Sequence, residues 1–313
     1  MFYRNFGFHI NSDVELPFWA ENNPVSKADI VILKSMRRPE LTDPIQRYTV
    51  DITASKQLVC YVADHKNSLI MDFENYVCFH YINDNDKYYF YYYFYDEYPI
   101  EWKERLISRF GIAYLLSWMG ITVLHGSAVC DAEKAICFIA DSNGGKSSVA
   151  GLFVANGWLM MADELVVLKP EKGEISLFPS SSYLHLSDES LNKIVFNHYL
   201  VSPIEFQFRN DFMDISESTN RVDLRTVTSL EECKCQKIIL LERGHDGGVA
   251  VYDYKKADAY MTLLQYLYTP IIFPAMRKNL MALIEPMVLK RMCFSDCFIQ
   301  FQDIEKICKG ELA

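Results

Sequence analysis

Hydrophobic and polar positions divide the chain into two regions with different periodicities. In residues 1–100, short runs rich in β-branched and aromatic residues alternate with turn-forming residues, as in "VILKS", "QLVCYVA", "SLIMDF" and "YVCFHYI". This alternation is typical of β-strands. The aromatic run 87–99, "KYYFYYYFYDEYP", predicts a further strand with rings on both faces, and an aromatic ligand surface is the alternative interpretation. We therefore expect a smaller β-rich N-terminal domain over residues 1–100.

The period changes in the segment 99–120, "PIEWKERLISRFGIAYLLSWMG". Its large apolar residues, among them Trp102, Leu106 and Phe110, recur near helical spacing. Gly120 suits the end of this helix, because glycine readily adopts the backbone conformation that follows a helix. The helix marks the boundary at which a second domain, residues 101–313, is predicted to begin.

From residue 121 onward, predicted strands and helices alternate, which indicates an α/β fold. Strands are predicted over 121–130, 134–140, 159–170, 174–179, 235–244 and 297–303. Helices are predicted over 146–157, 188–194, 255–268 and 273–292.

Composition narrows the classes of function. The chain has 313 residues and a formal net charge of −10, and it shows no broad basic face, so neither a nucleic acid nor a membrane is expected as a partner. The nine cysteines lack the spacing of a zinc site and fit reduced thiols. No signal peptide or membrane-spanning run stands out, so we expect a cytoplasmic protein.

A glycine-rich segment lies between a predicted strand and a predicted helix, in "AICFIADSNGGKSS". Such a loop offers backbone N–H groups to phosphates, a lysine reaches the β- and γ-phosphates, and the following serine holds magnesium. A glycine-rich turn without a ligand is the alternative. The strand and the helix favour nucleotide binding, for which the predicted residues are Asp141, Ser142, Asn143, Gly144, Gly145, Lys146, Ser147 and Ser148.

Two further motifs flank this loop. His125 lies in "LHGSA" before it, and Asp163 with Glu164 lies in "ADE" after it. Both motifs fall at the ends of predicted strands, and parallel core strands place their ends on the ligand side of a sheet. Either motif alone is usually structural. Around a phosphate loop, one carboxylate would accept a proton from an attacking hydroxyl and the other would help to hold magnesium.

The order of these three motifs resembles that of the HPr kinase/phosphorylase family, in its C-terminal P-loop kinase domain with a mixed sheet. That family has a His-Gly pair, then Gly-Asp-Ser-Gly-x-Gly-Lys-Ser, then Ala-Asp-Asp. This chain has His125-Gly126, then Ala140 to Ser147, then Ala162-Asp163-Glu164. The close match covers roughly residues 122–168, about 15% of the chain.

The resemblance implies a set of roles. Lys146 and the loop amides would bind the phosphates of ATP, and Ser147 with Glu164 would support Mg²⁺. Asp163 would be the general base for a serine hydroxyl, with His125 beside it.

The chain also departs from the family pattern. Ala140 and Asn143 stand where the family has glycines, and asparagine tolerates a left-handed backbone. Glu164 stands where the family has aspartate. The family's Glu-x-Arg-Gly-x-Gly signature has no counterpart, so the resemblance does not imply reverse phosphorolysis or HPr as the acceptor.

In overall form the chain is similar to HPr-kinase-like tailoring kinases of ribosomal-peptide pathways, including the lasso-peptide kinases. Those enzymes have a divergent N-terminal domain that opens near "YxxFGxxIxS", and "FYRNFGFHINSDVELP" resembles this opening. The resemblance implies an ATP-dependent kinase for a serine or threonine of a precursor peptide or small protein. It also implies that residues 1–100 recognise the peptide or another partner.

Phosphoryl transfer needs cations near the migrating group. Arg221, Arg225 and Arg243 are candidates, and Arg221 is the one we favour for the γ-phosphate. The histidines other than His125, among them His185, show no metal-ligand spacing and are interpreted as structural or surface residues.

Two other functions are compatible with the sequence. One is a nucleotide-binding regulatory module without catalysis, and the other is an ATPase or a kinase of a small metabolite. The oligomeric state stays open, with a homo-oligomer among the alternatives.

Overall fold

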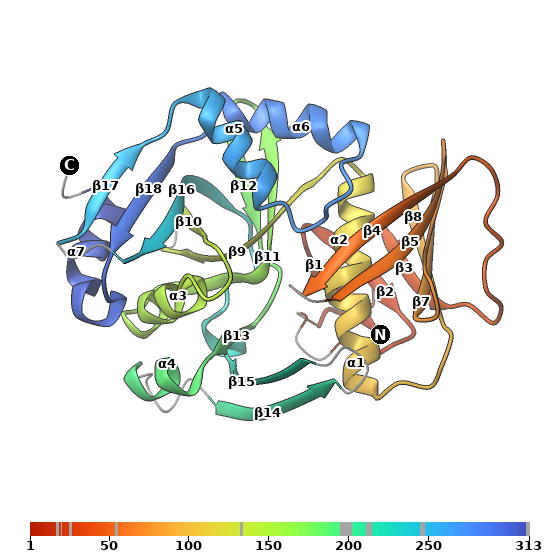
Figure 1. The fold of residues 1–313 in the computed structure, drawn as a ribbon, viewed down its shortest axis with the longest axis horizontal. Coiled ribbons are helices and arrows are strands. Elements are labelled where there is room, and N and C mark those ends of the chain that lie inside the picture. The colour runs from red at the N-terminus through yellow and green to blue at the C-terminus, as the bar shows by residue number, and fades with distance from the viewer. Residues whose placement is uncertain are drawn as a thin grey trace. The chain divides into compact units, whose positions relative to one another are not determined.

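The computed structural model describes residues 1–16, 19, 21–24, 27–53, 56–131, 134–194, 202–210, 215–244 and 248–310, and within these ranges the side chains of 50–53, 56, 57, 100, 101, 202–210 and 215–221 are not described. The chain forms two compact units, Met1–Met119 and Gly120–Ala313, which we call the N-terminal and C-terminal units (Figure 1). The N-terminal unit is rich in strands and the C-terminal unit is mixed α/β, in agreement with the predicted fold class.

The N-terminal unit is built on one eight-stranded sheet with the order β1-β2-β3-β8-β7-β6-β5-β4. The pairs β2–β3 and β3–β8 are parallel and the other pairs are antiparallel. The predicted strands are confirmed, including the aromatic one, which is β8. The strands are β1 (Phe2–Asn5), β2 (Phe8–Ser12), β3 (Ile30–Lys34), β4 (Ile45–Thr53), β5 (Lys56–His65), β6 (Ser68–Phe73), β7 (Val77–Asp84) and β8 (Lys87–Phe94).

The predicted helix at 99–120 is present as α1 (Ile100–Arg105), a π-helical turn η1 (Leu106–Gly111) and α2 (Ile112–Trp118). It ends before Gly120, whose φ is +87°. A Cβ atom added to Gly111 would lie 2.3 Å from Cζ of Phe90, and Tyr81 Oη donates to the Gly111 carbonyl at 2.8 Å. Because of this close packing on β7 and β8, the helix belongs to the N-terminal unit, whereas the sequence analysis placed it at the start of the second domain.

The C-terminal unit contains a seven-stranded mixed sheet with the order β10-β9-β11-β12-β16-β18-β17, and β10 also pairs with β16. The pairs β10–β16 and β16–β18 are parallel, whereas β9 is antiparallel to both β10 and β11. β10 therefore has β9 on one side and β16 on the other. The strands are β9 (Thr122–Cys130), β10 (Lys134–Ile139), β11 (Leu159–Glu171), β12 (Glu174–Phe178), β16 (Cys233–Arg243), β17 (Ala250–Asp253) and β18 (Leu289–Phe294).

Helices cover both faces of this sheet, and β10 shows how the sequence sorts its side chains between them. Ile136 and Phe138 pack in one cluster with α3 (Lys146–Ala155) and α7 (Cys297–Lys309). Cys137 and Ile139 pack in another with α5 (Lys256–Gln265) and α6 (Pro274–Ile284). Since successive side chains of a strand point to opposite faces, a continuous apolar run is what a strand covered on both sides requires.

Two predicted elements in the C-terminal part of the chain are wrong. The helix predicted over 273–292 is α6 followed by a turn and then β18, and Pro286 lies where the helix has ended. The strand predicted over 297–303 is the start of α7, which Asp296 caps with a hydrogen bond from the N–H of Phe298. The window 297–303 covers too few turns to display the helical period of the apolar residues that α7 buries.

A third sheet and some short helices complete the C-terminal unit. The sheet has the order β13-β15-β14, and none of its three strands was predicted. Among the described residues, no helix has both the length and the hydropathy needed to cross a membrane. The remaining elements are β13 (Tyr183–Leu186), α4 (Asp188–Lys193), β14 (Ser202–Asn210), β15 (Ile215–Asp223) and the 3-10 helix η2 (Arg225–Val227).

Candidate functional site

The glycine-rich loop, residues 140–145, connects the carboxyl end of β10 to the first residue of α3. Asn143 and Gly145 both have left-handed backbones, with φ of +61° and +94°, as the tolerance of asparagine for this conformation led us to expect. A Cβ atom added to Gly144 would lie 2.5 Å from the Cβ of Ala140. Ala140 is therefore accommodated where the family has glycine, because Gly144 leaves room for its methyl group.

Lys146 begins α3 and folds back over the loop. Its Nζ donates to the carbonyl oxygens of Ala140 at 3.0 Å and Asp141 at 3.2 Å. Burial lowers the pKa of Lys146, while the nearby carboxylates of Asp163 and Glu164 oppose this shift. The helix dipole destabilises a positive charge at a helix N-terminus, and an anion that binds there stabilises it. The loop carbonyls thus hold a cation at a place suited to bind phosphate.

Asp163 is a buried carboxylate that joins several segments, and only 2% of the residue is exposed. Its Oδ1 accepts hydrogen bonds from Ser127 Oγ at 2.6 Å and from Ser147 Oγ at 2.9 Å. Its Oδ2 accepts from the backbone N–H of His185 at 2.9 Å. The backbone of Asp163 is held as well, since its N–H donates to Ser181 Oγ at 2.9 Å. Asp163 therefore connects β9, β11, β13 and the start of α3.

The expectation that Asp163 and His125 lie at the ends of parallel strands is wrong. Asp163 lies within β11 and His125 within β9, and these strands are antiparallel to each other, as are β9 and β10. In the register of β9 and β11, Ser127 lies opposite Asp163 and Gly126 opposite Glu164. The antiparallel hairpin-like arrangement brings the middle of each strand, rather than its end, beside the loop.

Glu164 and His185 form a second polar pair next to Asp163. Glu164 has φ of +71°, an unfavourable conformation for a residue with a side chain. His185 Nδ1 lies 3.2 Å from Glu164 Oε1 and 3.6 Å from Asp163 Oδ2. Backbone strain of this kind clusters at functional sites. The sequence analysis interpreted His185 as a structural or surface residue, and alternation in Tyr183-Leu184-His185-Leu186, with both leucines buried, is the signal it missed.

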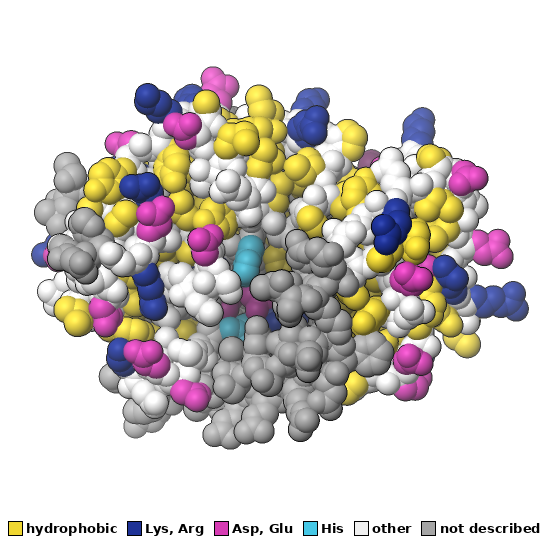
Figure 2. Space-filling view, in the orientation of Figure 1, with side chains coloured by type: hydrophobic (Ala, Val, Ile, Leu, Met, Phe, Trp, Pro, Cys, Tyr) yellow, Lys and Arg dark blue, Asp and Glu magenta, His cyan; other side chains and the backbone are white. Residues whose placement is uncertain are grey.

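These residues line one cavity of about 430 Å³ in the C-terminal unit. Figure 2 shows histidine and acidic side chains together where the surface is hollowed. The cavity brings together most of the predicted residues: His125, Ser142, Asn143, Gly145, Lys146, Ser147, Ser148, Asp163 and Glu164. Asp141 and Gly144 belong to the loop but do not line it. Arg243, one of the three candidate arginines, also lines the cavity, and the lining residues that were not predicted are His185, Ser187, Glu189, Ser190, Ser295, Asp296 and Phe298.

The exposed ring of His125 lies at the edge of this cavity. The backbone N–H of His125 donates to the carbonyl of Tyr266 at 2.8 Å, and its ring meets the ring of Tyr268 edge-on at a centroid distance of 6.1 Å. Tyr266 in turn donates to Asp141 Oδ1 at 3.0 Å. His125 is thereby held on the same side of the loop as Asp163.

Among the three candidate arginines, Arg243 lies at the loop. A Cβ atom added to Gly145 would be 3.4 Å from both Nε and an Nη atom of the Arg243 guanidinium. Arg225 instead forms an ion pair with Asp223. The side chain of Arg221 lies outside the described residues, although its backbone pairs with His185 across β13 and β15. The sequence analysis favoured Arg221 over Arg243, because β16, the strand that ends at Arg243, is distant from the loop in the chain.

The oxygen atoms of the cavity fit a hard cation. Mg²⁺ prefers oxygen ligands and is usually held by one or two protein groups together with phosphates. Ser147 donates its proton to Asp163, which leaves its oxygen lone pairs for a cation, and the carboxylates of Asp163 and Glu164 are adjacent. Within the described part of the chain, no cluster of three or more His, Cys, Asp or Glu residues could by itself hold a metal.

Comparisons with known proteins give a limited result. No protein-family profile matches the chain, and no curated protein matches it in sequence. Among solved structures, the chain is similar to the Hpr(Ser) kinase/phosphatase from Coxiella burnetii, with 9% identity and a TM-score of 0.31. The likeness covers 60% of this chain and 95% of that one. A likeness with so low a TM-score supports no conclusion about function.

Proposed function

We propose that the protein is an ATP-dependent kinase that transfers the γ-phosphate to a hydroxyl group, with Mg²⁺ as its cofactor. The observation that carries this proposal is the bond from Ser147, at the first turn of α3, to the buried carboxylate of Asp163. It links the glycine-rich loop to the acidic groups. One cavity therefore contains both the groups proposed to bind phosphate and the carboxylates. Phosphoryl transfer depends on this kind of positioning and charge stabilisation.

In the proposed site the residues along the cavity have separate binding roles. The loop N–H groups and Lys146 bind the phosphates, and the Lys146 ammonium exchanges the carbonyls of Ala140 and Asp141 for phosphate oxygens. Arg243 adds a second cation beside Gly145. Ser147 and Glu164 hold Mg²⁺, which supplies positive charge to the phosphate oxygens when it is bound.

Asp163 is proposed as the general base, and it would act through Oδ2. A carboxylate oxygen has two acceptor positions. From the described residues, Oδ1 accepts two hydroxyl hydrogen bonds, whereas Oδ2 accepts one backbone N–H. Oδ2 therefore keeps a position for the acceptor hydroxyl. His125 and His185 both line the cavity, and His185 Nδ1 lies within 3.6 Å of both carboxylates.

A serine or threonine of a peptide or small protein is the proposed acceptor, and a ribosomal precursor peptide is the proposed physiological one. This part rests on the resemblance to peptide-tailoring kinases, since the cavity geometry bears on the hydroxyl and not on the molecule that carries it. Recognition of that peptide by the N-terminal unit is part of the same proposal.

The test is transfer of labelled γ-phosphate from ATP, with Mg²⁺, to a library of serine- and threonine-containing peptides. We expect labelled peptide with the wild type, and loss of transfer with retained ATP binding for Asp163→Asn. Asp253→Asn, an exposed aspartate of β17, is the matched control. ATP hydrolysis without any labelled acceptor would indicate an ATPase, and ATP binding without turnover would indicate a regulatory module. Full transfer by Asp163→Asn together with loss in Glu164→Gln would reverse the roles of the two carboxylates.

A further inference from the structure

The cavity has a second end, beyond Arg243, that the proposed transfer of phosphate does not use. Its residues are Ser295, Asp296 and Phe298, which come from the turn between β18 and α7 and from the start of α7. The acidic end of the cavity is built by β9, β11 and β13, on the opposite side of β10. The loop and Lys146 lie between the two ends.

This topology determines which end of a bound nucleotide each end of the cavity can receive. A triphosphate on the loop has its γ-phosphate at one end and its nucleoside at the other. The adjacent carboxylates and histidines of the first end suit a metal, the γ-phosphate and a hydroxyl acceptor. The nucleoside then has to extend past Arg243 toward the start of α7.

We infer that Ser295, Asp296 and Phe298 bind the nucleoside of the nucleotide, with the base against the Phe298 ring and the ribose at Asp296. The inference rests on the proposed function, because it takes the loop to be the phosphate site. A planar base stacks well on an aromatic ring, and ribose hydroxyls are commonly bound by an acidic side chain. The cavity volume of about 430 Å³ is within the usual range for small-ligand sites.

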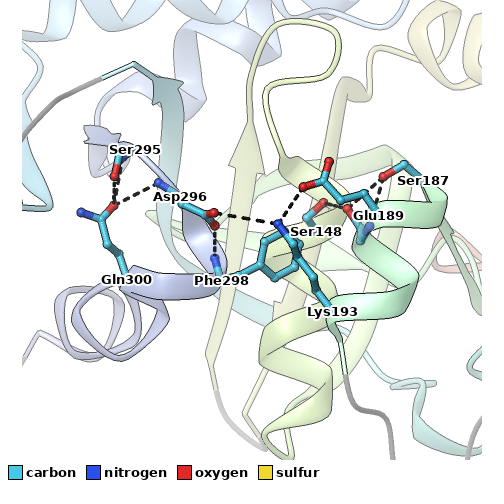
Figure 3. Close-up of polar contacts among 9 residues, drawn as sticks. Ser148, Ser187, Glu189, Lys193, Ser295, Asp296, Phe298 and Gln300 are labelled. Carbon is cyan, nitrogen blue, oxygen red and sulfur yellow. Dashed lines mark hydrogen bonds and ion pairs between the residues drawn. The ribbon is translucent and has the colours of Figure 1, made fainter.

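The turn that carries these groups is held in place by hydrogen bonds. Gln300 Oε1 accepts from the backbone N–H of Ser295 at 2.9 Å and of Asp296 at 3.3 Å (Figure 3). Asp296 Oδ1 caps α7 by accepting from the N–H of Phe298 at 2.8 Å. Asp296 Oδ2 does not serve this cap and lies 4.0 Å from Lys193 Nζ, so it has acceptor capacity for a ribose hydroxyl.

Helix α4 forms the opposite wall of this end. Its Ser190 Oγ lies 2.8 Å from Ser148 Oγ on α3 and 3.1 Å from Ser187 Oγ, which fixes α4 against the start of α3. Lys193 extends from α4 across the gap, with Nζ 4.9 Å from the centroid of the Phe298 ring. Figure 3 shows Lys193 over this ring, between Glu189 and Asp296.

Lys193 therefore occupies the ring face that the base would take. The lysine is 42% exposed and its partner Glu189 is 72% exposed, with Nζ 2.7 Å from Glu189 Oε1. A cation–π contact at an exposed site is weak, so a base can displace the ammonium group from the ring while the Lys193–Glu189 pair persists. The ring would exchange a cation contact for a stacking contact.

The experiment compares two ligands that share the phosphates and differ in the nucleoside. The affinities of the full-length protein for ATP and for inorganic tripolyphosphate are measured by calorimetry in the presence of Mg²⁺. We expect Phe298→Ala to weaken ATP binding by about 10-fold or more, from the usual strength of base–aromatic stacking. Tripolyphosphate affinity should change by less than about twofold, and Phe298→Tyr should restore ATP binding. Ile299→Ala, an exposed residue of the same helix, is the matched control.

The possible outcomes separate this inference from the proposed function. If neither ligand binds in a Lys146-dependent way, the proposed function fails. If both bind but Phe298→Ala leaves the ratio of the two affinities unchanged, the nucleoside inference is overturned and the proposed function stands. An equal loss of both affinities in Phe298→Ala, with Phe298→Tyr unable to restore either, would also overturn the inference. A higher KM for an acceptor peptide with unchanged ATP affinity would assign this end to the acceptor instead.

Discussion

Among the described residues, two aspartates are almost completely buried, one in each unit, and their surroundings differ. Asp72 in the N-terminal unit is 1% exposed and accepts hydrogen bonds from the Arg38 guanidinium and from Tyr95 Oη. Asp163 in the C-terminal unit is 2% exposed, and its described hydrogen-bond donors are two serine hydroxyls and a backbone N–H. Only Asp163 lines the cavity beside the loop.

The difference indicates two roles for a buried aspartate, stability in one unit and the proposed chemistry in the other. A buried carboxylate that is paired with a guanidinium has its charge offset within the fold. Asp163 accepts its described hydrogen bonds from neutral donors and lines a cavity, so its carboxylate can also interact with a cation that enters the cavity. We therefore assign Asp72 to stability and Asp163 to the proposed reaction.

The largest expected effect separates the two aspartates directly. Asp163→Asn should lower phosphate transfer by about 100-fold or more, in line with the loss of a general base. Asp72→Asn should leave transfer within about twofold but lower the free energy of unfolding by about 1–3 kcal/mol, because it removes the partner of a guanidinium. Kinetic assays and urea denaturation of both variants measure this. A large loss of activity in Asp72→Asn at unchanged stability would contradict the assignment.

The cations near the two aspartates should differ in the same way, with Lys146 affecting ATP binding and Arg38 affecting stability. Lys146→Met should weaken ATP binding by roughly 10-fold to 100-fold, since hydrogen bonds to charged groups contribute about 1.5–3 kcal/mol. The stability of the Lys146→Met variant should differ little from that of the wild type. Burial lowers the pKa of Lys146, so folding disfavours its charged form and removing the ammonium group costs little stability. Arg38→Met should lower the free energy of unfolding by about 1–3 kcal/mol and leave ATP binding unchanged. Titration calorimetry and denaturation check both, and equal stability losses would break the comparison.

A third test uses one glycine in each unit, Gly144 and Gly111, at which an added Cβ atom would meet a neighbouring side chain. Gly144→Ala should lower the free energy of unfolding by about 1–3 kcal/mol and weaken ATP binding, because the new methyl group meets that of Ala140. Adding Ala140→Gly should restore much of both. Gly111→Ala should cost stability by a similar or larger amount through its contact with Phe90, with ATP affinity unchanged. Failure of Ala140→Gly to rescue either property would show that the contact between these two methyl groups is not the cause.

Strain at Glu164 should appear as a gain in stability on its removal. Glu164→Gly should raise the free energy of unfolding by about 1 kcal/mol, because glycine adopts positive φ without strain, while transfer activity falls. Asn75→Gly, at φ of +65° in the N-terminal unit, should change stability less and leave activity unchanged. Denaturation with activity assays tests this. A destabilised Glu164→Gly would mean that the contact with His185 outweighs the strain.

The smallest effect concerns the pH dependence of stability. The folded state lowers the pKa of Lys146 below its ordinary value of 10.5, so the unfolded chain binds more protons in the window between the two values. Stability therefore rises with pH in that window, relative to a chain without this group. The difference in unfolding free energy between the wild type and Lys146→Met, measured from pH 8 to 10.5, should shift in favour of the wild type. A shift in the opposite direction would show that the lysine gains a stabilising partner on folding.

The sequence predicted much of the fold and part of the site. Strands of the N-terminal unit were readable because period-2 alternation and aromatic residues are local signals. The loop from Ala140 to Ser148 was readable because its glycines, lysine and serine are contiguous. β13 was missed because it is short and β15 because it is polar, whereas the alternation of Ile204, Phe206 and Phe208 with polar residues in β14 is a signal that the sequence analysis overlooked. α7 was mistaken for a strand from a window of only two turns.

The sequence by itself determined the composition of the loop: the residues that turn its backbone and those that are proposed to bind a phosphate or a cation. Only the tertiary structure decided which distant residues join them. His185, Arg243 and Phe298 come from β13, β16 and α7, and sequence distance gives no sign that these elements meet. The physical reason is that strand order and direction are set by packing of the whole sheet. The antiparallel pairing of β9 with β10 and β11 therefore placed His125 and Asp163 within strands rather than at their ends.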